Sequence, residues 1–300
     1  MCRHLGYVGP RVRVGDMLTL GAHSLRTQAW APRDMRRGGT INADGFGVAW
    51  WREDDEGAIT VSRYRNPAPI WTDPAVEEVL PQLESWAVLG AVRSATVGMP
   101  VQLSACAPFT HGRWAFSHNG VVPDWRTALT TVASEFSSTA NELGAGALFD
   151  ASRLLEAEAA TDSATLWVLL RGLLATDQPD GDWSAAPAAL RLLMAAVLAQ
   201  APKARLNLLL GDGAQLWATT WDHALSALVT DTFAILCSEP FDDDPRWQSV
   251  PDRSLVTARP NHLLVEPLLP VDPPPPGKPP LPGKPPLPGK TLSDPERLVQ

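Results

Sequence analysis

Cysteine is scarce in this chain of 300 residues, which contains only Cys2, Cys106 and Cys237. A low, odd number without close spacing gives neither a disulfide framework nor the ligand spacing of a zinc site, and it is typical of a reducing compartment. We therefore expect a cytoplasmic protein without a metal site. Cys106 and Cys237 stand among apolar or small residues, so we expect them to be ordinary core side chains.

Long hydrophobic runs and an excess of positive charge are missing as well. No run of about 18 apolar residues exists, which argues against a membrane span. Arg3, Arg11 and Arg13 interrupt the place where a signal peptide would have its apolar stretch. The net charge is −8. Because non-specific nucleic-acid binding needs a basic face, we expect neither a nucleic acid nor a membrane as partner. Gly-x-Gly-x-x-Gly and Walker sequences are absent too, so nothing supports nucleotide binding.

Proline, by contrast, is abundant, with 29 residues, and it is densest after residue 270, where Gly-Lys-Pro-Pro-Leu-Pro repeats from Gly277. Dense proline removes backbone donors and fixes φ, which excludes helix and sheet. We expect residues 270–300 to be a disordered or polyproline II tail, and residues 1–269 to form the folded domain. The tail either binds a proline-recognition module or is a solvated extension without a partner of its own.

The body of the chain alternates strand-like and helix-like runs. Strand-rich blocks at both ends with helices between them favour an α+β fold over a doubly wound parallel sheet. Gly211-Asp212-Gly213 supplies the positive φ of a tight hairpin between two of the strands. Helices are expected at 74–85, 152–158, 163–174 and 186–199, and strands at 47–51, 59–64, 87–93, 114–118, 206–210, 215–220, 224–229, 233–238 and 262–265.

Cys2 is the most informative residue, because it follows Met1 directly. A cysteine is small enough for the initiator methionine to be removed, which would leave a thiol and a free α-amine on one residue. An N-terminal amine has a pKa of about 8 and a thiol of about 8.5. At neutral pH part of the amine is therefore unprotonated and able to act as the base that a nucleophile normally needs from another residue. Position alone does not decide the matter, since most second residues have no role.

Two further segments have the residue types of a carbonyl-binding site. Arg93 follows an apolar strand and precedes a glycine-containing turn, so its planar fork of donors is suited to a carboxylate; the alternative is a surface salt bridge. Asn119 and Gly120 end another apolar strand, where a side-chain amide beside a backbone N–H can hold a developing oxyanion. Their alternative is an Asn-Gly hairpin turn, which is weakened by the Pro123 that follows.

A third segment, Thr161-Asp162-Ser163, stands just before an apolar helical run. Threonine or aspartate at this place is a normal helix N-cap. A carboxylate there is also able to bind an ammonium group.

Taken together, these segments resemble class II glutamine amidotransferase domains, which are N-terminal-nucleophile hydrolases. The resemblance is carried by MCRH at the start, INADGFG at 41–47, RSATVGMP at 93–100 and SHNGVV at 117–122. Within the family, six segments in the same order resemble the γ-glutamyl hydrolases of actinobacterial ergothioneine biosynthesis. They are MCRHLGYVG, VRSATVGMP, APF, ARLNLLL, ATTW and SEPFDDDPRW. The resemblance runs from Met1 to about Pro267 and implies that the domain folds as a four-layer αββα sandwich.

The resemblance also implies roles for single residues. Cys2 would be the nucleophile and its α-amine the base, Asn119 and Gly120 the oxyanion hole, and Arg93 the partner of the glutamyl α-carboxylate. An acidic residue downstream would hold the α-ammonium group, and Asp162 matches it best.

Asp150 and Glu142 compete for this last role, because the connection over 126–160 is longer than usual in the family. The family's chemistry uses no metal and no organic cofactor. The partner is a small-molecule γ-glutamyl substrate.

The implied reaction is hydrolysis of a γ-glutamyl amide, with γ-glutamyl-hercynylcysteine S-oxide as the expected substrate and glutamate as one product. The main alternative is a glutaminase subunit that supplies ammonia to a partner synthase. Val97 stands where many class II amidotransferases carry histidine, which favours a standalone hydrolase. A non-catalytic scaffold that acts through its proline-rich tail is a third interpretation. A self-processing peptidase is a poorer one, since no long propeptide precedes Cys2.

Overall fold

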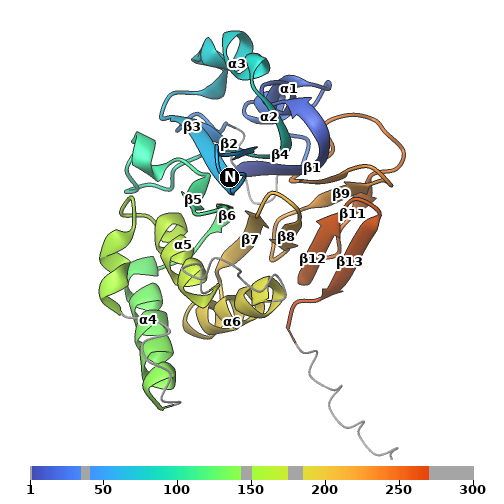
Figure 1. Ribbon diagram of the computed structural model, residues 1–300. Coiled ribbons are helices and arrows are strands. Elements are labelled where there is room, and N and C mark those ends of the chain that lie inside the picture. The colour runs from blue at the N-terminus through green and yellow to red at the C-terminus, as the bar shows by residue number, and fades with distance from the viewer. Residues whose placement is uncertain (1, 35–40, 143–150, 175–184, 270–300) are drawn as a thin grey trace, which may run out of the picture. The chain divides into compact units, whose positions relative to one another are not determined.

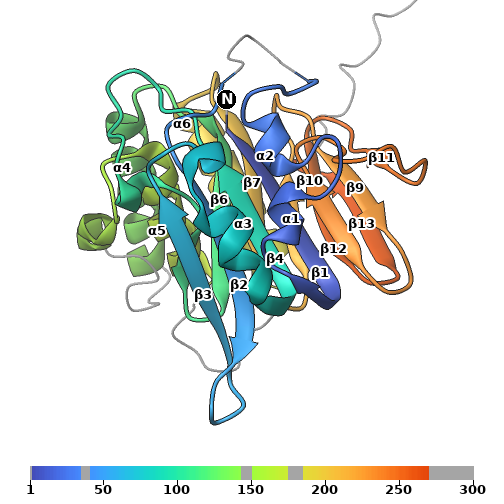
Figure 2. The ribbon, with the colours of Figure 1, turned by 90° about the horizontal axis from the view of Figure 1, so that it is seen from above.

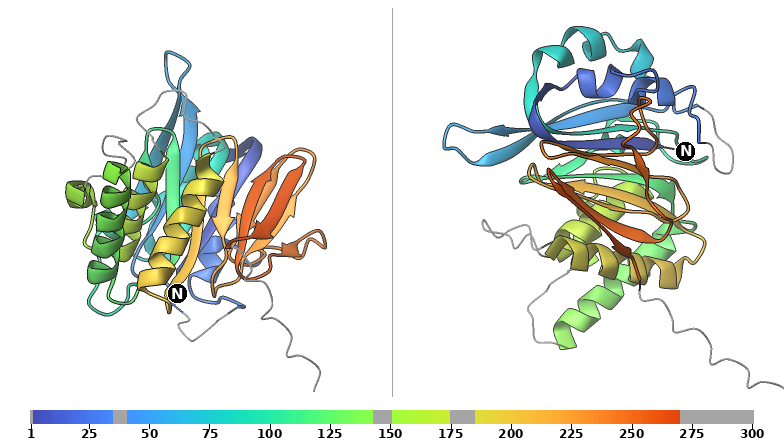
Figure 3. Two further views of the ribbon diagram at one scale, coloured as in Figure 1. Left: turned by 90° about the horizontal axis from the view of Figure 1, so that it is seen from below. Right: turned by 90° about the vertical axis from the view of Figure 1, so that its right-hand side faces the viewer.

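The computed structural model describes residues 2–34, 41–142, 151–174 and 185–269, so the proline-rich segment at 270–300 lies outside the described residues. The described chain forms two antiparallel sheets that stack face to face, with helices on both outer faces (Figures 1 and 3). The right-hand view of Figure 3 shows the order of the layers: helix, sheet, sheet, helix. The α+β class and the αββα sandwich are therefore confirmed.

Sheet A, the first sheet, has the chain's first strand at its centre. Its order is β11-β9-β10-β1-β4-β2-β3, with antiparallel neighbours throughout. Arg3 in β1 lies opposite Val92 in β4, so the start of the chain lies beside the end of β4. The strands of sheet A are β1 (Arg3–Arg13), β2 (Phe46–Glu53), β3 (Ile59–Asn66), β4 (Glu84–Val92), β9 (Ser226–Val229), β10 (Ala234–Cys237) and β11 (Gln248–Ser249).

Sheet B, the second sheet, has the order β13-β12-β8-β7-β6-β5 and is antiparallel as well. In the β6–β7 pair, Asn119 lies opposite Asn207. The strands of sheet B are β5 (Phe109–His111), β6 (Trp114–Val121), β7 (Arg205–Gly211), β8 (Leu216–Thr219), β12 (Ser254–Arg259) and β13 (His262–Pro267).

Short helices lie on the outer side of sheet A and longer ones on the outer side of sheet B, as Figures 1 and 2 show. None of the helices that the structure describes combines the length and the apolar character needed to span a bilayer. The α-helices are α1 (Asp16–Thr19), α2 (Leu25–Gln28), α3 (Ala75–Glu78), α4 (Trp125–Glu142), α5 (Asp162–Leu173) and α6 (Ala185–Gln200). The 3₁₀ turns are η1 (Ile70–Thr72), η2 (Leu80–Gln82), η3 (Leu103–Ala105) and η4 (Ala151–Glu156).

Three apolar clusters fill the three interfaces between the layers. Leu5 and Val88 belong to the cluster under the short helices, and Leu169 belongs to the cluster between sheet B and the long helices. The cluster between the sheets is rich in alanines such as Ala49 and Ala115, which let the two sheets approach closely. Burial of a leucine side chain contributes about 1.5–3 kcal/mol, so these clusters fix the relative position of the two sheets.

The sequence located most of these elements. The hairpin at Gly211-Asp212-Gly213 is confirmed: β7 and β8 are antiparallel, Gly213 has a φ of 93°, and the Asp212 carboxylate accepts hydrogen bonds from the backbone N–H groups of Ala214 and Gln215. The segment 152–158, expected as a helix, contains the 3₁₀ turn η4. The helices at 163–174 and 186–199 are confirmed, within one residue at each end, as α5 and α6.

One other expectation was wrong. The helix over 74–85 ends at Glu78, because Pro81 cannot donate to a helical ladder; the 3₁₀ turn η2 follows, and β4 begins at Glu84. The sequence did not predict α4, which occupies the first part of the lengthened connection over 126–160. The sequence also did not predict β1, whose glycines and Pro10 obscure its alternation; a register shift between Val8 and Val12 accommodates the proline.

Candidate active site

Strand β1 determines where Cys2 points. Leu5 and Tyr7 pack on the short helices, whereas the Nδ1 atom of His4 lies 3.3 Å from the Ser117 hydroxyl on sheet B. Because side chains alternate along a strand, Cys2 shares the face of His4 and is directed toward sheet B. The Cys2 thiol is half-buried, and its Sγ lies 3.8 Å from the carbonyl oxygen of Ser94.

Cys2 and Arg93 line one narrow cavity of about 20 Å³, together with Ser117, His118 and Ser163. The cavity lies where the start of β1, the end of β4 and strand β6 meet the beginning of α5. Asn119 and Asp162 do not line it themselves, but each is the chain neighbour of a residue that does, and Gly120 follows Asn119 in β6. The structure thus brings the five predicted site residues to one end of the two sheets.

The guanidinium of Arg93 is held by main-chain oxygens. Its Nη1 atom donates to Pro100 O at 2.9 Å and to Asp44 O at 3.4 Å. Among the residues that the structure describes, Arg93 forms no ion pair with a carboxylate, so the surface salt bridge considered above is wrong within that part of the chain. The remaining donors of the guanidinium are available for a carboxylate from outside the protein.

Asp44 organises the turn that carries Arg93. Its carboxylate accepts the backbone N–H of Ala95 at 2.7 Å, and its own N–H donates to Arg93 O at 3.0 Å. The N–H of Arg93 donates in turn to Gly45 O at 2.8 Å. The sequence singled out the INADGFG segment but assigned no function to this aspartate, since a main-chain contact across 51 residues leaves no local signal.

Asn119 and Gly120 lie inside β6, which continues to Val121, so the hairpin-turn alternative is wrong. Asn119 is fully buried and shares with Ser117 the face toward sheet A. Within the described part of the chain, neither polar atom of its side chain has a hydrogen-bond partner. A buried amide without a partner costs about 1–3 kcal/mol, which the fold tolerates most readily where a ligand satisfies it.

Glycine is the only residue type that fits at position 120. A Cβ atom there would lie 1.9 Å from Arg205 O and 2.5 Å from His118 Nε2. The first of these contacts is with main chain of the neighbouring strand, so any side chain would force β6 and β7 apart.

Asp162 is the first residue of α5, and the N-cap is Thr161, whose hydroxyl accepts the N–H of Ala164 at 3.2 Å. The N-cap interpretation is therefore confirmed for the threonine. The buried Asp162 carboxylate accepts the N–H of Val122 at 2.9 Å and that of Ser163 at 2.8 Å. Of the two competitors, Asp150 and the side chain of Glu142 lie outside the described residues.

Two buried histidines belong to the same polar interior. Burial, together with nearby His118 and His223, lowers the pKa of His4 to about 3. Burial, followed by the charge of Arg205, likewise lowers the pKa of His223 to about 3. Both rings are therefore neutral around the thiol at physiological pH.

The other two cysteines are core residues, as expected. Cys106 and Cys237 are fully buried. Burial raises the pKa of the Cys106 thiol, and it raises the pKa of Cys237 to about 11. Neither thiol is therefore suited to act as a nucleophile.

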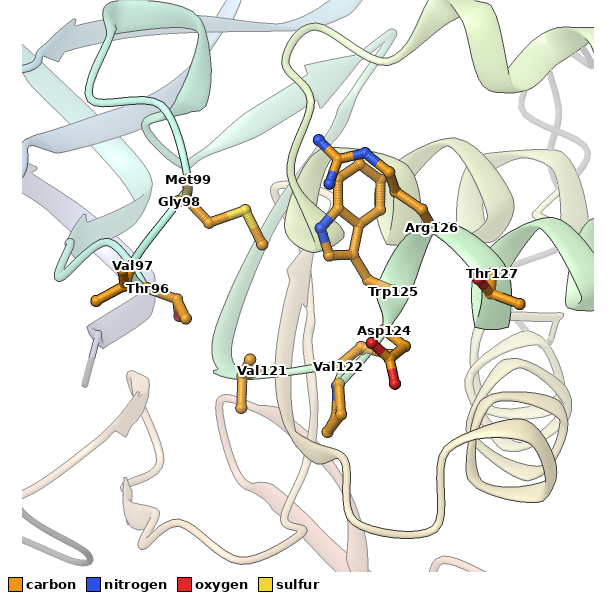
Figure 4. Close-up of a pocket in the computed structure, with 11 residues that line it drawn as sticks. Thr96, Val97, Gly98, Met99, Val121, Val122, Asp124, Trp125, Arg126 and Thr127 are labelled. Atoms are coloured by element: carbon orange, nitrogen blue, oxygen red, sulfur yellow. The ribbon is translucent and has the colours of Figure 1, made fainter.

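A wider cleft of about 410 Å³ lies between the segments that follow two of the predicted site residues, Arg93 and Gly120 (Figure 4). The segment 96–99, which follows Arg93, forms one wall, and the segment 121–127, which follows Gly120, forms the other. In Figure 4 the Met99 side chain points across the cleft toward Trp125. The Arg126 guanidinium stacks over the Trp125 ring at 4.5 Å.

Comparison with known proteins identifies proteins that resemble this chain in sequence and in fold. The sequence model of the class-II glutamine amidotransferases matches residues 19–232. A γ-glutamyl-hercynylcysteine sulfoxide hydrolase of Mycolicibacterium smegmatis is 38% identical over 89% of this chain and 100% of its own length. One of Mycobacterium tuberculosis is 41% identical over 85% of this chain and 92% of its own. The structure of a glutamine aminotransferase class-II domain protein from Silicibacter pomeroyi superposes with a TM-score of 0.56 at 20% identity, covering 89% of this chain and 100% of its own.

Proposed function

Because the chain belongs to the class-II glutamine amidotransferase family, we propose that it hydrolyses the γ-glutamyl amide bond of γ-glutamyl-hercynylcysteine sulfoxide, a step of ergothioneine biosynthesis, in the cytoplasm. The observation that carries the proposal is the identity of 38–41% with two sulfoxide hydrolases over 85–89% of the chain. The site geometry supports it, since a half-buried thiol, an arginine and a buried amide without a partner meet at one end of the sheets.

In the proposed mechanism, removal of Met1 leaves Cys2 with a free α-amine, which takes the proton of its own thiol. The thiolate attacks the γ-carbonyl carbon of the substrate. The Asn119 amide and the Gly120 N–H stabilise the oxyanion, and loss of one such donor costs about 3 kcal/mol in the barrier. The protonated amine then gives its proton to the leaving nitrogen, and water activated by the same amine releases glutamate from the thioester.

Two side chains of opposite charge would orient the substrate. The free donors of Arg93 would bind the glutamyl α-carboxylate, and the Asp162 carboxylate would bind the α-ammonium group. Two charged contacts with one small zwitterion fix its position and orientation. The γ-carbonyl carbon is thereby held in line with the thiol. No step in this scheme requires a metal ion or an organic cofactor.

Two amide substrates test the proposal. Purified protein should release glutamate from γ-glutamyl-hercynylcysteine sulfoxide with a far higher kcat/KM than from glutamine, and intact-mass analysis should show that Met1 is gone. Cys2→Ala should release none. Equal or better turnover of glutamine would favour the glutaminase alternative instead. Full activity in protein that retains Met1 would remove the proposed base.

A further inference from the structure

The beginning of α5 holds strand β6 on both sides of the Asn119–Gly120 pair. Before the pair, the His118 Nδ1 atom lies 3.0 Å from the Ser163 hydroxyl. After it, the N–H of Val122 donates to the Asp162 carboxylate at 2.9 Å. Neighbouring residues of one helix thus bracket the segment that carries the proposed oxyanion hole.

The hydrogen bonds of His118 fix the state of its ring. The Nε2 atom lies 2.9 Å from Arg205 O, and because a carbonyl oxygen only accepts, Nε2 carries the proton. In that tautomer Nδ1 is an acceptor, so the Ser163 hydroxyl donates to it at 3.0 Å in preference to Asp162 Oδ1, which lies farther away at 3.5 Å. His118 is only 3% exposed, which limits competition from water for either bond. The ring therefore connects β7, β6 and α5 through two oriented hydrogen bonds.

Ser163 continues the connection to the proposed ammonium-binding acid. Its backbone N–H donates to the Oδ1 atom of Asp162 at 2.8 Å, while its hydroxyl is engaged with His118. One residue therefore contacts both the acid and the histidine that precedes Asn119.

We propose that His118 and Ser163 form a positioning pair that sets the spacing between the oxyanion hole on β6 and the ammonium-binding carboxylate on α5. This inference rests on the proposed function. In a γ-glutamyl group the reacting carbonyl and the α-ammonium are separated by a fixed short chain, whereas their protein partners stand on two different elements. The pair keeps these elements at the separation that lets both ends bind at once. Both side chains line the cavity of Cys2, but within the described residues neither forms a hydrogen bond with the thiol.

A pair of substrates that differ only in the α-ammonium group measures this spacing. We would compare γ-glutamyl-hercynylcysteine sulfoxide with its glutaryl analogue, which lacks the amine, and follow the common product hercynylcysteine sulfoxide. The ratio of the two kcat/KM values reports how well the carboxylate of Asp162 is used while the carbonyl is in place. A general loss of folded protein lowers both values equally and leaves the ratio unchanged.

The Ser163→Ala variant keeps the backbone N–H to Asp162 and removes only the hydroxyl. We expect its ratio to fall about tenfold, the effect of one oriented hydrogen bond. His118→Gln retains a donor that can reach Arg205 O but loses the acceptor for Ser163, so we expect a similar fall. Because the two side chains act as one unit, the double variant should fall no further than either single one.

Thr165→Val is the matched control, since Thr165 lies in the same helix, is buried, and donates its hydroxyl to Thr161 O at 2.9 Å, with no side-chain hydrogen bond to β6 among the described residues. Its ratio should equal that of the wild type. A wild-type ratio in Ser163→Ala, or an equal fall in Thr165→Val, overturns the positioning pair while leaving the proposed function intact. Wild-type protein that hydrolyses neither substrate overturns the proposed function, and this inference falls with it.

Discussion

The backbone N–H of Val122 donates to the Asp162 carboxylate across 40 residues of sequence. Strand β6 therefore ends against the beginning of α5, and the chain between them, which includes α4 and η4, leaves and returns at the same place. This closure explains how a lengthened connection can be inserted without separating Asp162 from Asn119 and Gly120.

Thiol labelling should distinguish Cys2 from the other two cysteines. Burial raises the pKa of Cys106, and it raises that of Cys237 to about 11, so both remain protonated and covered at pH 8. Iodoacetamide should give one adduct in folded protein, on Cys2, and three adducts after unfolding in urea. Cys2→Ala should take up none when folded. Labelling of Cys106 or Cys237 at a comparable rate would contradict this order of reactivity.

Asn119 and its cross-strand partner Asn207 should respond oppositely to truncation. The Asn119 amide has no partner within the described residues, so Asn119→Ala should lower kcat about 10²–10³-fold and change Tm little.

Asn207 instead bonds four main-chain groups, donating to His223 O and Ala224 O and accepting from the N–H groups of Trp221 and His223. Asn207→Ala should therefore cost about 2–4 kcal/mol of unfolding free energy, since several buried groups lose their partner. Urea unfolding and glutamate release separate the two cases. The prediction fails if Asn119→Ala unfolds as readily as Asn207→Ala.

Gly120→Ala should abolish activity and destabilise the protein. Its Cβ would lie 1.9 Å from Arg205 O, so the main chains of β6 and β7 would have to separate beside the proposed oxyanion hole. Gly211→Ala on β7 is the control, because its nearest contact is a side-chain atom, the edge of the buried Trp51 ring at 3.2 Å, and not main chain. Thermal unfolding and kcat measure both variants. Retained activity in Gly120→Ala would show that this segment does not face the substrate.

Stability should depend on pH through His4 and His223. Both have a folded pKa of about 3 and an unfolded pKa of about 6.5, so between these values only the unfolded chain binds the protons. Stability is complete above about pH 6.5 and falls as the pH drops toward 3. At pH 5 each histidine should cost about 2 kcal/mol relative to pH 7.

Urea unfolding at pH 7, 6 and 5 checks this prediction. His223→Leu should flatten the pH dependence, whereas Val88→Ala, a core truncation without a titrating group, should lower stability by the same amount at each pH. Parallel curves for wild type and His223→Leu would show that this histidine is not kept neutral by the fold.

The sequence predicted those features of the fold that are determined by residues close together in the chain. The end of β4 just before Arg93, the start of α5 within one residue of the predicted Ser163, and the turn at Gly211-Asp212-Gly213 follow from residue types at fixed spacing. Asn119–Gly120 has the local signature of a turn, and only the pairing of β6 with β7, about 90 residues away, makes it strand. The main-chain role of Asp44 and the link between His118 and Ser163 depend on contacts between distant segments, which no window of sequence contains.

The placement of Cys2 at the head of the central strand of sheet A has a practical consequence for handling the protein. A purification tag fused ahead of Cys2 would acylate the amine that we propose as the base. Such a fusion would fold normally yet be inert until a protease trimmed it back to the cysteine. Affinity handles therefore belong at the far terminus, after the proline-rich segment.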